Sequence, residues 1–503
     1  MPYIDLVYAK DDYASLWYTT NSPTGAVSSF DPDKPTVILL HPIFLDSTWL
    51  DNQFDDPRIN ACYNLIAFDA RCAGKTISRP SGKHDHWTDC ADLAFACMTL
   101  WLPPAHIWAS ESFATNTALR FAMLFPEMCL SITMLTVPTP TELKIYFAPF
   151  DDILNRWVYS EDLDTIEHTL NEICTFLLGL DVHPDLLDDL ISYLEMRYPP
   201  FQRSRIGEMA NTIMNRTPLT ARELATVTAP CLLIHGEGNQ IHPLEYAERM
   251  KAELVNAKGG ARLFILKGCE GYLNVVPSIA SLANQVFSKF LARLPHADSE
   301  LLPPEESIPD RMQRALEQLA ELAGNPSIAD RNPLSSMSFS RVEPEVKQLQ
   351  ESAIRLFASG QHKAFSPLGA DGVRCASTQS GSTITGSWAT AKATPIPVRN
   401  NRAPAYRQRP KPDWAAPART DSKLGTAARD SMDVAGPGAR DAAYEPASTE
   451  LMHDGAMRRS ALSVNPASVE RFVVKGNVSR VAMSALPGSG AVSKMLLRSG
   501  SGS

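Results

Sequence analysis

The sequence lacks the features that mark secreted, disulfide-stabilised and membrane-spanning proteins. No stretch approaches the ~20 uninterrupted apolar residues of a membrane-spanning helix, and charge appears at Asp5, so no secretory signal is expected. The nine cysteines form no C-x-x-C pair, and several lie inside apolar runs, as buried free thiols do. The sequence therefore predicts a soluble, cytoplasmic protein without a disulfide framework.

Positive charge is scarce in the first part of the chain. Of the 47 Lys/Arg and 56 Asp/Glu residues, 28 and 46 lie in residues 1–360, a net charge of −18, whereas residues 361–503 carry +9. An acidic body argues against binding of nucleic acid there. The positive charges of the tail are scattered, with only short clusters such as residues 402–409, so we interpret the tail as solvated.

Apolar residues become sparse from about residue 360 onward, where Ala, Ser, Pro, Gly and Arg dominate. Such a composition cannot offset the entropy of ordering the chain. We therefore predict one large domain at residues 1–295, a linker at 296–360 and a disordered, low-complexity tail at 361–503. The linker contains two amphipathic stretches, 308–322 and 346–357, which either dock on the domain or bind a protein partner.

Short apolar runs alternate with helical patterns through the first 295 residues. This alternation is typical of an α/β fold, with a mostly parallel sheet covered by helices on both faces. One gap of about ninety residues, at about 138–228, has only helical patterns, which predicts a cap over the carboxyl edge of the sheet. The predicted strands are residues 36–40, 63–69, 106–110, 131–137, 231–235 and 261–266.

A strand, a sharp turn and a helix are predicted at residues 106–124. The turn reads SESFA from Ser110 and resembles the nucleophile elbow G-x-S-x-G of α/β-hydrolases, with other small residues at both glycine positions. The resemblance implies that Ser112 is the nucleophile and that the amide of Phe113 is one oxyanion donor. The alternative is an ordinary strand-to-helix turn whose serine caps the helix.

Three other segments strengthen the resemblance to capped α/β-hydrolases. Residues 37–46 (VILLHPIFLD) resemble the strand and loop that supply the second oxyanion donor, here the amide of Ile43. Residues 69–76 (DARCAGKT) resemble the D-x-R-G-x-G-x-S loop, whose Asp and Arg fix loop geometry. Residues 230–243 resemble the strand and turn that present the triad acid. All of these segments occur in the order that the family requires.

Two of the three triad positions hold unexpected residues. The acid position falls on Asn239, whose amide can orient a histidine but cannot stabilise an imidazolium by charge. The base position, after the last strand, falls on Gly271, and no histidine lies between His242 and His296. Without a base, Ser112 would keep a hydroxyl pKa far above neutrality and attack poorly.

Other residues are candidates for the missing roles. Glu237 would take the place of the acid only if the turn were shifted by two residues relative to the family pattern. Otherwise it is a solvated surface carboxylate. His235 and His242 lie near the edge of the sheet where chemistry would occur, so either is a candidate base displaced from its usual position. His41 lies in the oxyanion loop, where the family's histidine braces the backbone.

Two further groups of polar residues occur in the sequence. Glu111 and Glu270 would form a carboxylate site if they met in the fold. His84 and His86 flank Asp85 in a polar segment, but no further metal ligands follow at a recognisable spacing. We therefore predict no metal and no cofactor.

Three functions remain open from the sequence. The first is a domain of hydrolase descent that binds a small molecule in its capped pocket without hydrolysing it, or that hydrolyses weakly. The second is an active ester hydrolase that uses Ser112 with a displaced base. The third is an interaction protein that acts through residues 308–357 and the tail, because a fold does not by itself determine a function.

Overall fold

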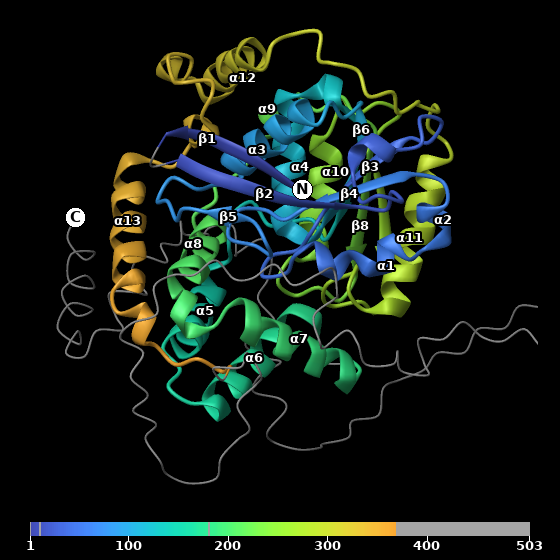
Figure 1. The fold of residues 1–503 in the computed structure, drawn as a ribbon. Helices are drawn as coiled ribbons and strands as arrows, with labels where there is room; N and C mark the ends of the chain where they lie inside the picture. Colours follow the sequence, from blue (N-terminus) through green and yellow to red (C-terminus); the bar gives the residue numbers. More distant parts are fainter. Residues whose placement is uncertain (1, 10–11, 180–181, 369–503) are drawn as a thin grey trace, which may run out of the picture.

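A mixed sheet of nine strands forms the centre of the computed structural model, which describes residues 2–9, 12–179 and 182–368 (Figure 1). The strand order is β1-β2-β4-β3-β6-β7-β8-β9, with β5 paired to β2. The pairs from β4 through β9 are parallel, and the pairs made by β2 are antiparallel. The strands are β1 (Tyr3–Ala9), β2 (Asp12–Thr20), β3 (Thr36–Leu40), β4 (Asn64–Phe68), β5 (Ile77–Ser78), β6 (Ala105–Ser110), β7 (Cys129–Leu135), β8 (Cys231–Gly236) and β9 (Arg262–Leu266).

Helices cover both faces of this sheet, which confirms the predicted fold class. In β3, Ile38 packs into the cluster shared with α3 (His86–Thr99) and α4 (Glu111–Leu124), whereas its neighbour Val37 packs into the cluster shared with α11 (Pro277–Leu291). Successive strand residues point to opposite faces. A strand buried on both faces must therefore be apolar throughout, which explains the continuous apolar runs of the sequence. Three more helices border the sheet: α1 (Asp51–Phe54), α2 (Pro57–Asn60) and α10 (Leu244–Glu253).

The predicted helical cap lies between β7 and β8. Its residues form a separate hydrophobic cluster that packs on the oxyanion-loop residues Phe44 and Trp49. In Figure 1 the helices α5 to α8 lie together at the bottom of the molecule, below the sheet. The helices of this segment are α5 (Lys144–Val158), α6 (Leu163–Leu178), α7 (Pro184–Arg197), α8 (Arg203–Met214) and the short α9 (Ala221–Leu224).

Both amphipathic stretches of the predicted linker form helices that pack on the domain. Met312 and Leu316 of α12 (Ile308–Ala323) are fully buried in the cluster that contains α3 and α4. Phe357 of α13 (Pro344–Ala358) is fully buried against Gly207 of α8. Both helices therefore belong to the folded body, although Leu349 on α13 stays exposed.

Some parts of the fold had no counterpart in the sequence-based predictions. Among them are the hairpin of β1 and β2, cap helix α5, helix α10, and helix α3, which begins at His86 within the segment we had expected to be a polar loop. The eight described cysteines are free, and all but Cys62 are buried. The predicted tail lies outside the described residues from residue 369 onward.

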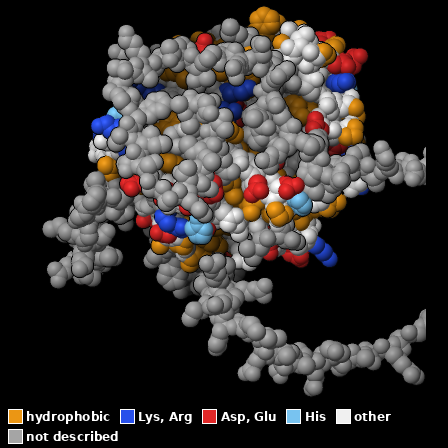
Figure 2. Space-filling view, turned by 60° about the horizontal axis from the view of Figure 1, so that its bottom comes forward, with side chains coloured by type: hydrophobic (Ala, Val, Ile, Leu, Met, Phe, Trp, Pro, Cys, Tyr) orange, Lys and Arg blue, Asp and Glu red, His pale blue; other side chains and the backbone are white. Residues whose placement is uncertain are grey.

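No helix in the described part of the chain is long and apolar enough to cross a membrane. On the coloured part of the face in Figure 2, acidic side chains (red) lie among hydrophobic (orange) and basic (blue) ones.

Candidate functional site

A pocket lies between the carboxyl edge of the sheet and the cap, with a cavity volume of about 120 Å³. This is the size range of a cavity that holds a benzene-sized molecule. Three of the sequence-predicted site residues line it together with Ser112, namely Ile43, Asn239 and Gly271. The structure thus brings loops after β3, β6, β8 and β9 to one place, as expected for the carboxyl edge of an open α/β sheet.

The strained residue of the strand-to-helix turn is Glu111 and not Ser112. Glu111 has a left-handed backbone with φ of 68°, whereas Ser112 lies in the first turn of α4. The positive φ thus falls one residue before the predicted nucleophile Ser112, and sequence spacing does not reveal which residue takes it. The helix-capping alternative fails, because Ser110 is the N-cap residue and its side chain makes no capping hydrogen bond.

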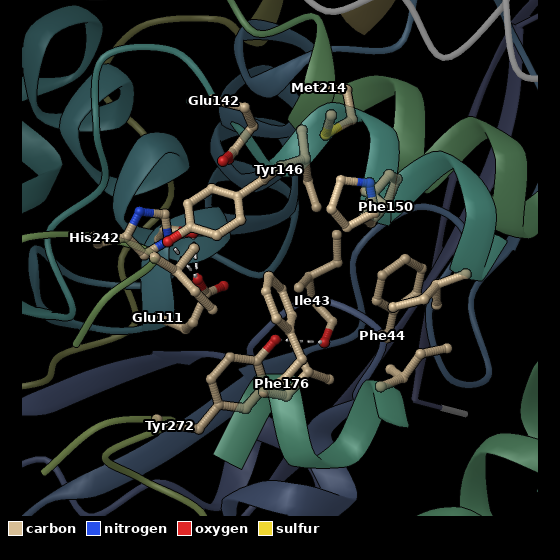
Figure 3. A pocket seen from close by; sticks show the side chains of 18 of the residues that line it. Ile43, Phe44, Glu111, Glu142, Tyr146, Phe150, Phe176, Met214, His242 and Tyr272 are labelled. Atoms are coloured by element: carbon tan, nitrogen blue, oxygen red, sulfur yellow. Dashed lines mark hydrogen bonds and ion pairs between the residues drawn. The ribbon is translucent and has the colours of Figure 1, made fainter. Parts of the chain in front are cut away.

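The carboxylate of Glu111 is buried at the floor of the pocket and is held by three donors. The hydroxyl of Ser112 donates to Oε1, and the amide of Phe113 donates to Oε2 at 3.1 Å. His242 Nε2 lies 3.6 Å from Oε1 (Figure 3). Burial alone would raise the pKa of Glu111, but these interactions outweigh it and hold the pKa below its usual value. Glu111 is therefore a carboxylate at neutral pH.

Of the two backbone amides predicted as oxyanion donors, one is already hydrogen-bonded and the other, in the part of the chain that the structure describes, is not. The amide of Phe113 is already occupied by Glu111, so it does not face an empty site. The amide of Ile43 makes no hydrogen bond within the described residues. The carbonyl oxygen of Ile43 accepts a long hydrogen bond of 3.4 Å from the hydroxyl of Tyr272 (Figure 3).

Both histidines considered as displaced bases have their ring nitrogens engaged. The amide of Thr139 donates to His242 Nδ1 at 3.4 Å, which leaves the proton of the neutral ring on Nε2, facing Glu111. His235 Nδ1 accepts from the amide of Val137 at 3.0 Å, and its Nε2 donates to the carbonyl of His242 at 2.8 Å. Burial lowers the pKa of His235 to about 4.

The altered acid position supports the backbone. Asn239 is buried, and its Oδ1 accepts a hydrogen bond of 2.8 Å from the amide of His242, which fixes the turn that carries this histidine. Glu237 is exposed, as the solvated alternative predicted.

The altered base position has no room for a side chain. A Cβ on Gly271 would lie 2.3 Å from the carbonyl carbon of Leu178, at the end of cap helix α6. A histidine there would collide with the cap backbone. Glu270 does not line the pocket, so it does not form the carboxylate site with Glu111 that the sequence left open.

Backbone strain gathers around this pocket. Besides Glu111, Phe44 and Thr136 line the pocket with φ of 56° and 59°. Non-glycine residues in this region cost roughly 1–3 kcal/mol each and persist where the surroundings determine them. A β-branched threonine at positive φ is a particular outlier.

The rest of the pocket wall is largely apolar and comes from the cap. Phe150 of α5 and Phe176 of α6 face Phe44 across the cavity (Figure 3). Tyr146 also borders the pocket, and its hydroxyl donates to the carbonyl of Gln240 at 2.7 Å. Burial raises the pKa of Tyr146 to about 12, so it stays neutral.

The loops beneath the pocket are braced as the family resemblance implied. His41 donates from Nδ1 to its neighbouring carbonyl, and its Nε2 accepts from the amide of Ala70 at 3.0 Å. Asp69 accepts from the amides of Ser47 and Lys75, both at 2.8 Å. Gly74 is required here, because its φ is +49° and a Cβ would lie 2.0 Å from the Asp69 carboxylate.

The sheet order, the helices on both faces, the cap after β7 and the strained turn after β6 define the α/β-hydrolase fold. No protein-family model and no curated protein sequence matches the chain.

Three solved structures illustrate what this chain is similar to in fold. A bromoperoxidase from Bacillus anthracis is 15% identical, with a TM-score of 0.45 over 58% of this chain and 99% of its own. A thermophilic esterase from Thermogutta terrifontis has the same identity and TM-score, over 59% of this chain and 100% of its own. An enol-lactonase from Burkholderia xenovorans LB400 is 13% identical, with a TM-score of 0.44 over 56% and 97%. Likenesses of this degree carry no argument about the reaction.

Proposed function

We propose that this chain is a non-hydrolytic α/β-hydrolase-fold protein that binds a small, mostly apolar molecule in the capped pocket. One observation carries the proposal: the carboxylate of Glu111 takes up both the Ser112 hydroxyl and the Phe113 amide. Acyl transfer needs donors that are free for the developing oxyanion, and of the two predicted donors the Phe113 amide is not free. A buried anion at this place opposes that charge and does not stabilise it.

The hydrogen bonds of the pocket also argue against activation of Ser112. Its hydroxyl proton points to a carboxylate whose pKa is lowered, which makes that carboxylate a weak base. His242 faces Glu111 through a protonated nitrogen and offers Ser112 no lone pair in this arrangement.

The polar groups of the pocket define the class of ligand. Glu111 is an ionised acceptor in a mostly apolar cavity that Glu142 also lines, so the pocket favours a ligand with one hydrogen-bond donor, such as an alcohol or an amine. A ligand carboxylate would be repelled by Glu111 and would lose its hydration on entry. The ligand class is therefore a small apolar alcohol or amine.

Two measurements test the proposal. A fluorophosphonate probe should leave the folded protein unlabelled. Isothermal titration with a series of small aryl-alkyl alcohols and amines should show binding, and the matched carboxylic acids should not bind. Glu111→Gln should remove this preference, Ile213→Trp should fill the pocket and abolish binding, and Val255→Trp on the exposed surface should leave binding unchanged.

Active-site labelling would overturn the proposal. Labelling that disappears in Ser112→Ala would establish an activated serine, and the ester-hydrolase alternative would replace ligand binding. Equal binding of acids and alcohols would contradict the role of Glu111.

A further inference from the structure

A second cluster of reactive side chains lies outside the pocket. Cys72 follows β4, His84 precedes α3, and Glu208 comes from cap helix α8, so the three residues are far apart in the sequence. All three are at least 98% buried. One donor atom from each lies within 4.8 Å of the other two. None of them lines the pocket between the sheet and the cap.

The donors face one another at short range. Cys72 Sγ donates to Glu208 Oε2 at 2.8 Å, and His84 Nδ1 lies 3.2 Å from Glu208 Oε1. His84 Nδ1 therefore faces the Glu208 carboxylate, and the donor atoms of all three side chains lie close enough together to ligate one ion.

The other ring nitrogen of His84 is fixed by a carboxylate. Nε2 lies 2.7 Å from Oδ1 of Asp89 in α3. A carboxylate on the distal nitrogen is the usual way in which proteins orient a metal-binding histidine and raise its basicity.

The cluster is also held rigidly at both ends. The amide of Ser81 donates to Glu208 Oε1 at 3.0 Å. Arg205, on the same helix as Glu208, donates to the carbonyls of Cys72 and Gly74. Cys72 itself takes a left-handed backbone with φ of 61°, a strained conformation that turns its side chain toward α8.

We propose that Cys72, His84 and Glu208 form a zinc site that ties cap helix α8 to the body of the domain. Sulfur, imidazole nitrogen and carboxylate oxygen are the donors that Zn²⁺ uses, at about 2.0–2.3 Å. A tetrahedral ion would place these donors about 3.3–3.8 Å apart, so small side-chain shifts suffice. As the zinc–sulfur and zinc–nitrogen bonds form, the Cys72 thiol and the imidazolium form of His84 each lose one proton to the buffer, the latter from Nδ1, while His84 Nε2 keeps its proton toward Asp89. A thiolate donor excludes Mg²⁺ and Ca²⁺, which prefer oxygen ligands.

Metal titration of the full-length chain tests this proposal. The test uses a Cys62→Ser/Cys375→Ser background, which removes the exposed thiol and the thiol outside the described residues. After chelator treatment, the protein should take up one equivalent of Zn²⁺, and saturation should raise Tm by about 3–5 °C. Co²⁺ should give a sulfur-to-metal charge-transfer band. Glu208→Gln and Cys72→Ser should each weaken Zn²⁺ binding at least tenfold.

Each outcome decides for or against the site. A folded protein that binds no Zn²⁺ would show that the cluster is a hydrogen-bond network only. Co²⁺ binding without a charge-transfer band would exclude Cys72 as a ligand, whatever the variants do. If Cys72→Ser does not fold, unchanged Zn²⁺ affinity in the near-isosteric Glu208→Gln would still overturn the proposal.

Discussion

At the scale of the residue, the pocket is defined by Glu111. It occupies the strained position after β6, where the family resemblance led us to expect a serine. The glutamate carboxylate is long enough to fold back onto the amide of Phe113, so the residue blocks the donor that a nucleophile at this position would need. The chemistry of the pocket thus depends on which of two adjacent residues takes the positive φ.

Glu111→Gln should remove a pH-dependent part of the stability. Because the pKa of Glu111 is lowered in the folded state, its contribution is present above the unfolded pKa of about 4.5 and is lost as pH falls through the folded pKa. We expect the variant to be less stable by about 1–2 kcal/mol at pH 7, and the difference to shrink below about pH 4.5. Urea unfolding at several pH values measures this difference in unfolding free energy, and Glu237→Gln at an exposed site is the control. A difference that stays constant with pH would contradict the prediction.

At the scale of the element, α13 packs on the cap and belongs to the folded body. Phe357 touches α8 at Gly207, where a Cβ would lie 2.4 Å from the ring. Arg203 of α8 donates to the carbonyls of Phe357 and Ser359. A glycine in α8 therefore allows close approach of the two helices, and hydrogen bonds to the end of α13 fix its position.

Phe357→Ala should destabilise the protein by about 3 kcal/mol, because it leaves a cavity between α13 and α8. Leu349→Ala lies on the same helix but at a site that is 40% exposed, and it should cost less than about 1 kcal/mol. Chemical denaturation of both variants measures the difference. Equal losses of unfolding free energy in the two variants would mean that α13 does not stay packed on the cap in solution.

At the scale of the whole molecule, buried neutral histidines make the free energy of unfolding depend on pH. Burial lowers the pKa of His106 and of His235 to about 4. An unfolded histidine titrates near 6.5. Between these values the unfolded chain binds more protons than the folded one, so stability falls as pH falls.

Unfolding free energy should therefore drop as the pH is lowered from about 6.5 toward 4. With His86, whose pKa burial also lowers to about 4, three such histidines give a slope of about 3–4 kcal/mol per pH unit in the middle of this range. His106→Gln should reduce the slope by about a third. Urea unfolding of both proteins between pH 7 and pH 5 measures it, and identical slopes would show that His106 does not titrate as its burial requires.

Six of the nine strands, and the loops that line the pocket, follow from short local patterns in the sequence. Continuous apolar runs predict strands that are buried on both faces, and β3 begins and ends at the predicted residues. The positions of Ile43, Asn239 and Gly271 followed from motifs local to strand ends, and all three line one pocket. Such signals are readable because each depends on a few consecutive residues.

The contacts between residues that are distant in the sequence follow from the packing of the elements and not from local patterns. The positive φ of Glu111 and its contact with His242 depend on packing between β6, α4 and the turn after β8. The approach of Cys72 to Glu208 depends on how the cap lies on the loop after β4. These contacts join residues that are distant in the sequence, and the steric constraints that produce them exist only once the sheet, helices and cap have packed together.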